Sequence, residues 1–98
     1  MESIARYRFY CGSNNTTKKP EVEKATLCLS RANIDGFSVL NSVVGSWKGE
    51  QEQSFIIEVL ATPESKFNDD KATEIKQLLK TELQQYEVLT TKEWIKTL

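Results

Sequence analysis

Four residues around one glycine-containing segment carry the side chains best suited to bind a small molecule. Trp47 and Lys48 stand together at the end of a β-branched run, and Glu52 and Ser54 follow a few positions later. A tryptophan beside an ammonium group can stack a base or hold an anion. A carboxylate and a hydroxyl can hydrogen-bond to a ligand. The alternative is structural: Trp47 packs in a core or an interface, while Glu52 and Ser54 orient it or pair with Lys48.

Arg8 and Tyr10 are two further candidates. Residues 5–11 alternate between apolar and polar, and Arg6, Arg8 and Tyr10 share one face of the predicted strand. Because arginine binds phosphate or carboxylate in a bidentate geometry, a cleft between subunits on this face would suit an anion. The alternative role for the arginines is to form ion pairs between subunits.

Weaker signals come from the loop after this strand and from Gln85. Gly12-Ser-Asn-Asn lies between a strand and a helix, where its backbone N–H groups could bind an anion. The loop matches neither of the glycine-rich nucleotide fingerprints. Gln85 stands at a helix-to-strand junction, where capping and turn roles are common.

The composition argues against catalysis and against metal binding. The chain of 98 residues has no histidine and two cysteines, Cys11 and Cys28. Histidine is the commonest general base and metal ligand, and two distant cysteines alone make neither a zinc site nor a cysteine–histidine nucleophile. We therefore expect no enzyme activity, no metal and no cofactor, and we expect both thiols to be reduced and buried.

The net charge and its distribution limit the classes of partner that the chain is expected to bind. The net charge is −1, with an isoelectric point of about 5.5, which gives no electrostatic reason to expect nucleic acid as a partner. No basic amphipathic helix is apparent, and the apolar runs are far shorter than the ~20 residues that span a bilayer. The residues after Met1 lack a signal-peptide pattern. We expect a cytoplasmic location and no binding to membranes.

A long β-hairpin in residues 36–61 is expected to position the candidate residues, with its turn in the polar segment 48–53. Side-chain alternation predicts two core-facing sets. They are Phe37, Val39, Val43 and Trp47 in the first arm, and Phe55, Ile57, Val59 and Ala61 in the second.

Two amphipathic helices and two more strands complete the chain. Pro20 suits the first turn of one helix, and Asn68 is the predicted N-cap of the other. Their apolar stripes are Val22, Ala25, Leu29 and Ala32, and Ala72, Ile75, Leu79, Leu83 and Tyr86. The last strand is predicted at residues 86–91, and residues 92–98 form a tail of undefined structure.

This order, β-α-β-β-α-β within one domain of residues 1–98, predicts an α+β, ferredoxin-like fold. Right-handed crossovers place both helices on one face of a four-stranded antiparallel sheet with strand order 4-1-3-2. The uncovered face would carry Tyr10, Leu40, Val44, Ile56 and Leu60. An apolar patch of this kind marks an interface, so we expect a homo-oligomer that buries this face.

Three short motifs resemble those of PII-like proteins of the short bacterial and phage type. Gly45-Ser-Trp-Lys-Gly49, followed by Glu52 and Ser54, is similar to their Gly-x-Trp-Lys-Gly…Glu-x-Ser pattern. Arg8-Phe-Tyr-Cys-Gly12 resembles their first strand, and Gln85-Tyr-Glu-Val-Leu89 the entry to their last strand. The broader relatives, the nitrogen-regulatory PII and CutA-like proteins, are ferredoxin-like trimers. Many PII members bind adenine nucleotides in clefts between subunits.

The resemblance implies a trimer that binds a nucleotide or another small anion without catalysis. Its ligand-binding residues would be Trp47, Lys48, Glu52 and Ser54, with Arg8 and Tyr10 completing the pocket from a neighbouring subunit. The alternative is an oligomeric interaction module that contacts a protein through the hairpin tip and has no small-molecule ligand.

Overall fold

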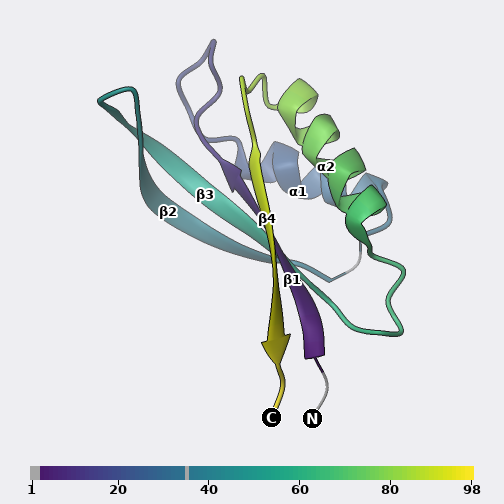
Figure 1. Ribbon diagram of the computed structural model, residues 1–98. Helices are drawn as coiled ribbons and strands as arrows, with labels where there is room; N and C mark the ends of the chain where they lie inside the picture. Colours follow the sequence, from purple (N-terminus) through teal and green to yellow (C-terminus); the bar gives the residue numbers. More distant parts are fainter. Residues whose placement is uncertain (1–2, 35) are drawn as a thin grey trace.

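The sheet and its two helices are arranged as the sequence predicts. The computed structural model describes residues 3–34 and 36–98, apart from the side chains of Ser42 and Trp47. Its elements are β1 (Ser3–Cys11), α1 (Val22–Arg31), β2 (Ser38–Trp47), β3 (Glu50–Ala61), α2 (Asp69–Glu82) and β4 (Leu89–Lys96). The antiparallel sheet has the order β2-β3-β1-β4, and both helices cover one face (Figure 1). The α+β, ferredoxin-like prediction and its strand order are confirmed.

The hydrophobic core lies between the sheet and the helices. Phe9 and Ile57 stand opposite each other on β1 and β3, and both are fully buried. Leu29 of α1 and Leu79 of α2 pack into the same core and are also fully buried. Burying a side chain of this size stabilises a fold by about 1.5–3 kcal/mol. The buried residues of the two predicted helix stripes therefore contribute much of the hydrophobic stabilisation of the folded state.

Both cysteines are buried, as predicted, and they form no disulfide. Burial raises the pKa of the Cys11 thiol to about 12. The Cys11 side chain is therefore protonated at neutral pH and serves as a small apolar core residue.

The helix boundaries follow the predicted caps closely, with two differences. The Asn68 side chain accepts a hydrogen bond from the Lys71 backbone N–H at 2.9 Å, which confirms the N-cap of α2. Pro20 precedes α1, whose N-cap is Glu21, and is not in its first turn. Tyr86 lies beyond α2 and is 81% exposed, so it is not part of the buried stripe.

The hairpin turn is shorter than predicted. Lys48 and Gly49 form a two-residue turn with φ angles of 52° and 82°, and Trp47 pairs with Glu50. Positive φ at both positions is typical of the tight turn whose twist matches that of two antiparallel strands. The segment 50–53 therefore belongs to β3. Glu52 lies opposite Gly45, well back from the tip.

An irregularity in β2 overturns two further predictions. Leu40 pairs with Ile56, but Val43 pairs with Ser54, so β2 contains one extra residue between Leu40 and Val43. Such a bulge moves every later residue to the other face of the sheet. Val43 therefore lies on the same face of the sheet as Ser54 and not on the predicted core side. Val44, which is 70% exposed, lies on the opposite face from the one predicted.

Strand β4 starts later and runs further than predicted. It begins at Leu89 and extends through most of the predicted tail, and its pairing with β1 continues to Ser3 opposite Lys96. This pairing places the start of β1 beside the end of β4 (Figure 1). The pairing depends on residues far away in the sequence, which explains why local composition did not reveal it.

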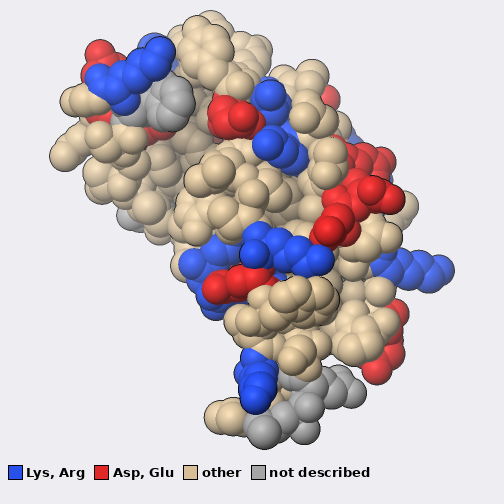
Figure 2. Space-filling model, viewed as in Figure 1, with Lys and Arg blue, Asp and Glu red and all other residues tan. Residues whose placement is uncertain are grey.

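The uncovered sheet face combines exposed apolar residues with a charged centre. Leu40 and Leu60 are 39% and 46% exposed. Between them and β4, Arg8 Nε donates to Glu58 Oε2 at 2.8 Å, and Arg6 forms an ion pair with Glu93. Figure 2 likewise shows acidic and basic groups interleaved near the middle of the molecule and not gathered by sign. No helix in the described residues is long and apolar enough to cross a membrane.

Candidate ligand-binding site

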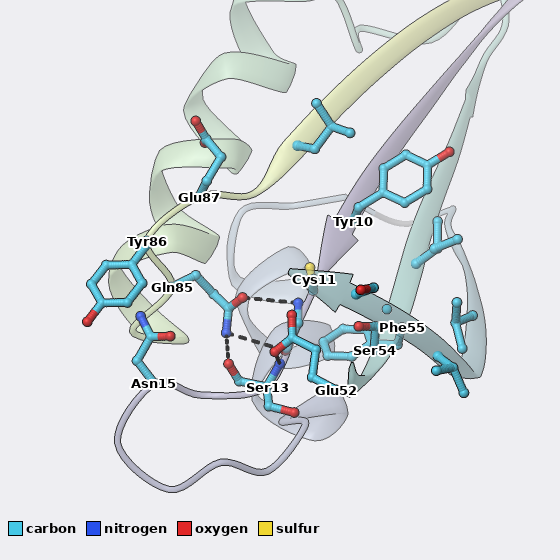
Figure 3. Close-up of a pocket in the computed structure, with 17 residues that line it drawn as sticks. Tyr10, Cys11, Ser13, Asn15, Glu52, Ser54, Phe55, Gln85, Tyr86 and Glu87 are labelled. Atoms are coloured by element: carbon cyan, nitrogen blue, oxygen red, sulfur yellow. Dashed lines mark hydrogen bonds between the residues drawn. The ribbon is translucent and has the colours of Figure 1, made fainter. Parts of the chain in front are cut away.

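A pocket of about 390 Å³ forms where three segments that are distant in sequence converge. They are the end of β1 with its following loop, the bulged part of the β2–β3 hairpin, and the linker from α2 to β4 (Figure 3). One part of the wall is apolar or aromatic and includes Tyr10, Val43, Ile56 and Leu89; another is polar and includes Ser13, Glu52, Ser54 and Gln85. The size and mixed lining are typical of small-molecule sites.

Gln85 ties two of these segments together. Its Oε1 accepts a hydrogen bond from the Gly12 backbone N–H at 3.0 Å, and its Nε2 donates to the Ser13 carbonyl at 2.6 Å (Figure 3). The side chain therefore does more than shape a local turn, because it fixes the α2–β4 linker against the end of β1. The sequence motif around Gln85 pointed to this residue but could not show its partner.

Glu52, on the β2–β3 hairpin, connects this third segment to the loop after β1. Its Oε2 accepts a hydrogen bond from the Ser13 backbone N–H at 3.2 Å. A Cβ atom at Gly12 would lie 2.5 Å from Glu52 Oε1, which is closer than such contacts allow. A side chain at Gly12 would therefore displace the carboxylate from its present position.

Gly45 has a similar role beside Ser54. A Cβ atom at Gly45 would lie 2.6 Å from the Ser54 hydroxyl oxygen. Because Gly45 also pairs with Glu52 across the hairpin, the Gly…Glu-x-Ser pattern describes tightly packed neighbouring strands. The pattern builds the pocket wall and not the hairpin tip.

The six predicted ligand-binding residues are not all brought together. Tyr10, Glu52 and Ser54 line the pocket. Arg8 instead bonds to Glu58 on the uncovered face, and that hydrogen bond raises the pKa of the guanidinium. The remaining two are at the tip: Lys48 in the turn, and Trp47, whose side chain is outside the described residues.

A second hollow, of about 700 Å³, adjoins the pocket. Four residues line both: Ser13, Asn15, Glu52 and Tyr86. This outer hollow also contains Lys18, Lys48 and Glu50. A ligand larger than the pocket would therefore extend toward two ammonium groups.

Glu87, on the pocket's upper rim, remains ionised. The Val88 backbone N–H donates to its Oε1 at 3.0 Å, and Lys76 Nζ lies 3.4 Å from the same oxygen. The hydrogen bond from Val88, with help from Lys76, lowers the pKa of the carboxyl group. Within residues 3–34 and 36–98, no three histidine, cysteine, aspartate or glutamate side chains are grouped so as to hold a metal ion.

Neither a protein-family profile nor a curated protein matches the sequence. Solved structures do match. One is CPII from Thiomonas intermedia K12, a nitrogen regulatory PII-like protein bound to ADP, AMP and bicarbonate, with a TM-score of 0.61 and 11% identity over 96% of this chain and 91% of that one. Its apo form matches with a TM-score of 0.59 and 10% identity over 96% and 90% of the two chains.

The chain has a PII-like fold. A further CPII structure, bound to ADP, AMP and acetate, agrees, with a TM-score of 0.55 and 16% identity over 95% of this chain and 86% of that chain. At these identities the likeness concerns the path of the backbone. The pocket in this PII-like chain has to be interpreted from its own residues.

Proposed function

We propose that this PII-like chain is a non-catalytic binding protein that takes a nucleotide, or a related small anion, in the pocket beside Glu52. The main support is the convergence of three segments on one pocket of about 390 Å³, held in place by side chains that bond to backbone groups. The CPII structures described as bound to ADP and AMP make a nucleotide the first ligand to test.

The two adjoining hollows suggest how such a ligand lies. The base and sugar occupy the pocket, where the Tyr10 ring forms part of the wall and Ser54 and Glu52 offer hydrogen-bonding groups. The anionic end points into the outer hollow, toward Lys18 and Lys48. Roles for Trp47 and Arg8 in binding stay predictions.

We also propose that the protein acts as a homo-oligomer, most simply a trimer, that buries the uncovered sheet face. Leu40, Leu60 and Leu89 are each more than a third exposed on that face. The neighbouring pairs Arg8–Glu58 and Arg6–Glu93 satisfy the charges at its centre, which reduces the cost of removing them from water.

The proposal assigns no reaction to the pocket. Glu87 has a lowered pKa, which suits an ion-paired surface carboxylate better than a general acid. A protein-interaction role for the hairpin tip is the second candidate, because the β2–β3 hairpin projects away from the helices (Figure 1).

A thermal-shift screen with AMP, ADP and ATP tests the proposal. A ligand that binds only the folded protein at a concentration of about 100 times its Kd should raise the Tm by several degrees. Inorganic phosphate at equal concentration is the control for a non-specific anion effect. If none of the nucleotides raises the Tm, the binding role is rejected and the hairpin-tip role moves ahead.

A further inference from the structure

Residues 12–18, the first part of the loop after β1, have backbone N–H groups that all donate to acceptors within the protein. Gly12 donates to Gln85, and Ser13 donates to Glu52. Each backbone N–H group of residues 14–18 donates to another residue, which in all cases but one lies in the same loop. Anion sites at the start of a helix depend on donors that lack a partner, so residues 12–18 do not offer their backbone N–H groups to a phosphate.

Glu52 places a negative charge where a phosphate loop would hold its ligand. The carboxylate lies against the Gly12–Ser13 backbone and lines both the pocket and the outer hollow. A ligand oxyanion near this wall would be repelled. A ligand hydroxyl or amino group would instead find an acceptor there.

The charges around the two hollows limit how much negative charge a ligand can bring. The charged side chains among the described residues that line the outer hollow are Lys18, Lys48, Glu50 and Glu52, which sum to zero. Glu87, on the pocket, is paired with Lys76 and Lys80. A monophosphate carries about −1.5 to −2 at pH 7, which the two lysines can balance. Each further phosphate adds negative charge that the two lysines do not balance, near the carboxylates of Glu50 and Glu52.

We propose that the site is selective for nucleosides and nucleoside monophosphates and discriminates against di- and triphosphates. This inference rests on the proposed function and narrows its ligand class. The ligand's uncharged part donates hydrogen bonds to Glu52, and a single phosphate lies between Lys18 and Lys48. Because like charges brought together in a binding site are strongly unfavourable, ATP should bind at least about tenfold more weakly than AMP.

Calorimetry on the full chain, with adenosine, AMP, ADP and ATP in EDTA at fixed salt, tests this selectivity. We expect adenosine and AMP to bind more tightly than ADP, and ADP more tightly than ATP. Binding of ATP as tight as that of AMP would overturn the inference while leaving the proposed function standing. Failure of all four to bind would overturn both.

Glu52→Gln examines the origin of the selectivity. The amide retains an oxygen that can accept the Ser13 hydrogen bond, but it removes the charge, so the ratio of ATP to AMP affinity should rise several-fold. Glu64→Gln makes the same change in net charge at an exposed residue outside both hollows and should leave the ratio unchanged. An unchanged ratio in Glu52→Gln would show that Glu52 does not set the selectivity.

Discussion

Glu52 Oε1 lies so close to Gly12 that a Cβ atom there would be 2.5 Å away. The two residues are 40 positions apart in the 98-residue chain, yet a side chain at the first would displace the carboxylate of the second. Ser13 then donates its backbone N–H to the same carboxylate. The contact fixes one wall of the pocket relative to the end of β1.

Gly12→Ala should therefore destabilise the protein. The added methyl group forces the end of the flexible Glu52 side chain to move and so weakens the hydrogen bond that it accepts from Ser13; losing one such bond costs about 0.5–1.5 kcal/mol. Urea denaturation gives the free energy of unfolding. Gly36→Ala is the matched control, because a Cβ atom there meets nothing within 4 Å. Equal stability of the two variants would mean that the Gly12 contact relaxes without cost.

Leu79 is predicted to be among the most sensitive core positions. It is fully buried on α2, so Leu79→Ala leaves a cavity and should lower the free energy of unfolding by about 2–5 kcal/mol. Leu27→Ala, at a residue that is 53% exposed on α1, should change it by less than about 0.5 kcal/mol. A shared denaturation midpoint for the two variants would contradict the packing described above.

Asp69 links the N-terminus of α2 to β4 and should make stability depend on pH. Its Oδ1 accepts hydrogen bonds from Lys92 Nζ and the Tyr7 hydroxyl, both at 2.7 Å, and these contacts lower the pKa of the carboxyl group below its ordinary 3.8. A lowered pKa in the folded state means that the contribution to stability is present above pH 3.8 and is lost as the pH falls through the folded-state value.

Asp69→Asn should consequently reduce the fall in Tm between about pH 5 and pH 2, measured by thermal denaturation against pH. Asp70→Asn is the control at the neighbouring first-turn position. If wild type and Asp69→Asn lose stability in parallel over this range, the Lys92 and Tyr7 contacts do not act on the Asp69 carboxylate in solution.

The proposed assembly is tested at Leu40, which pairs with Ile56 on the uncovered face. Leu40→Asp would bury a charge without a partner, so it should dissociate the oligomer or leave the protein insoluble. Light scattering gives the mass, and Leu27→Asp on α1 is the control that should keep the wild-type mass. A stable wild-type monomer at micromolar concentration would refute the assembly outright.

Local sequence patterns were sufficient for much of the fold. The alternation in β3 and the helical spacing of Ala72, Ile75 and Leu79 each report burial along one element, and these faces agree with the structure. The right-handed crossover rule then gave the strand order. The features that were missed depend on pairing between elements: the bulge in β2, the two-residue turn, and the extension of β4 along β1.

The pocket could be predicted only in part for the same reason. Short motifs pointed to Gly45, Glu52, Ser54 and Gln85, but they did not say that Gln85 and Glu52 both bond to the backbone at Gly12 and Ser13. The sequence predicts a turn that spans residues 48–53, which would place Glu52 and Ser54 at the hairpin tip. Nothing in the sequence around Gly12 indicates that this residue lies against the Glu52 carboxylate.

A larger side chain that fills the pocket shows whether the ligand binds there. Leu89 lines the pocket and is 58% exposed, so Leu89→Trp places a larger side chain there without disturbing the core. Leu27→Trp is the control outside both hollows, and light scattering checks that each variant keeps the wild-type mass.

The deciding measurement is the calorimetric affinity for AMP. We expect Leu89→Trp to weaken binding at least about tenfold, a loss of about 1.4 kcal/mol, and Leu27→Trp to bind as wild type does. Wild-type affinity in a Leu89→Trp variant that keeps the wild-type mass would show that AMP binds elsewhere and not in this pocket.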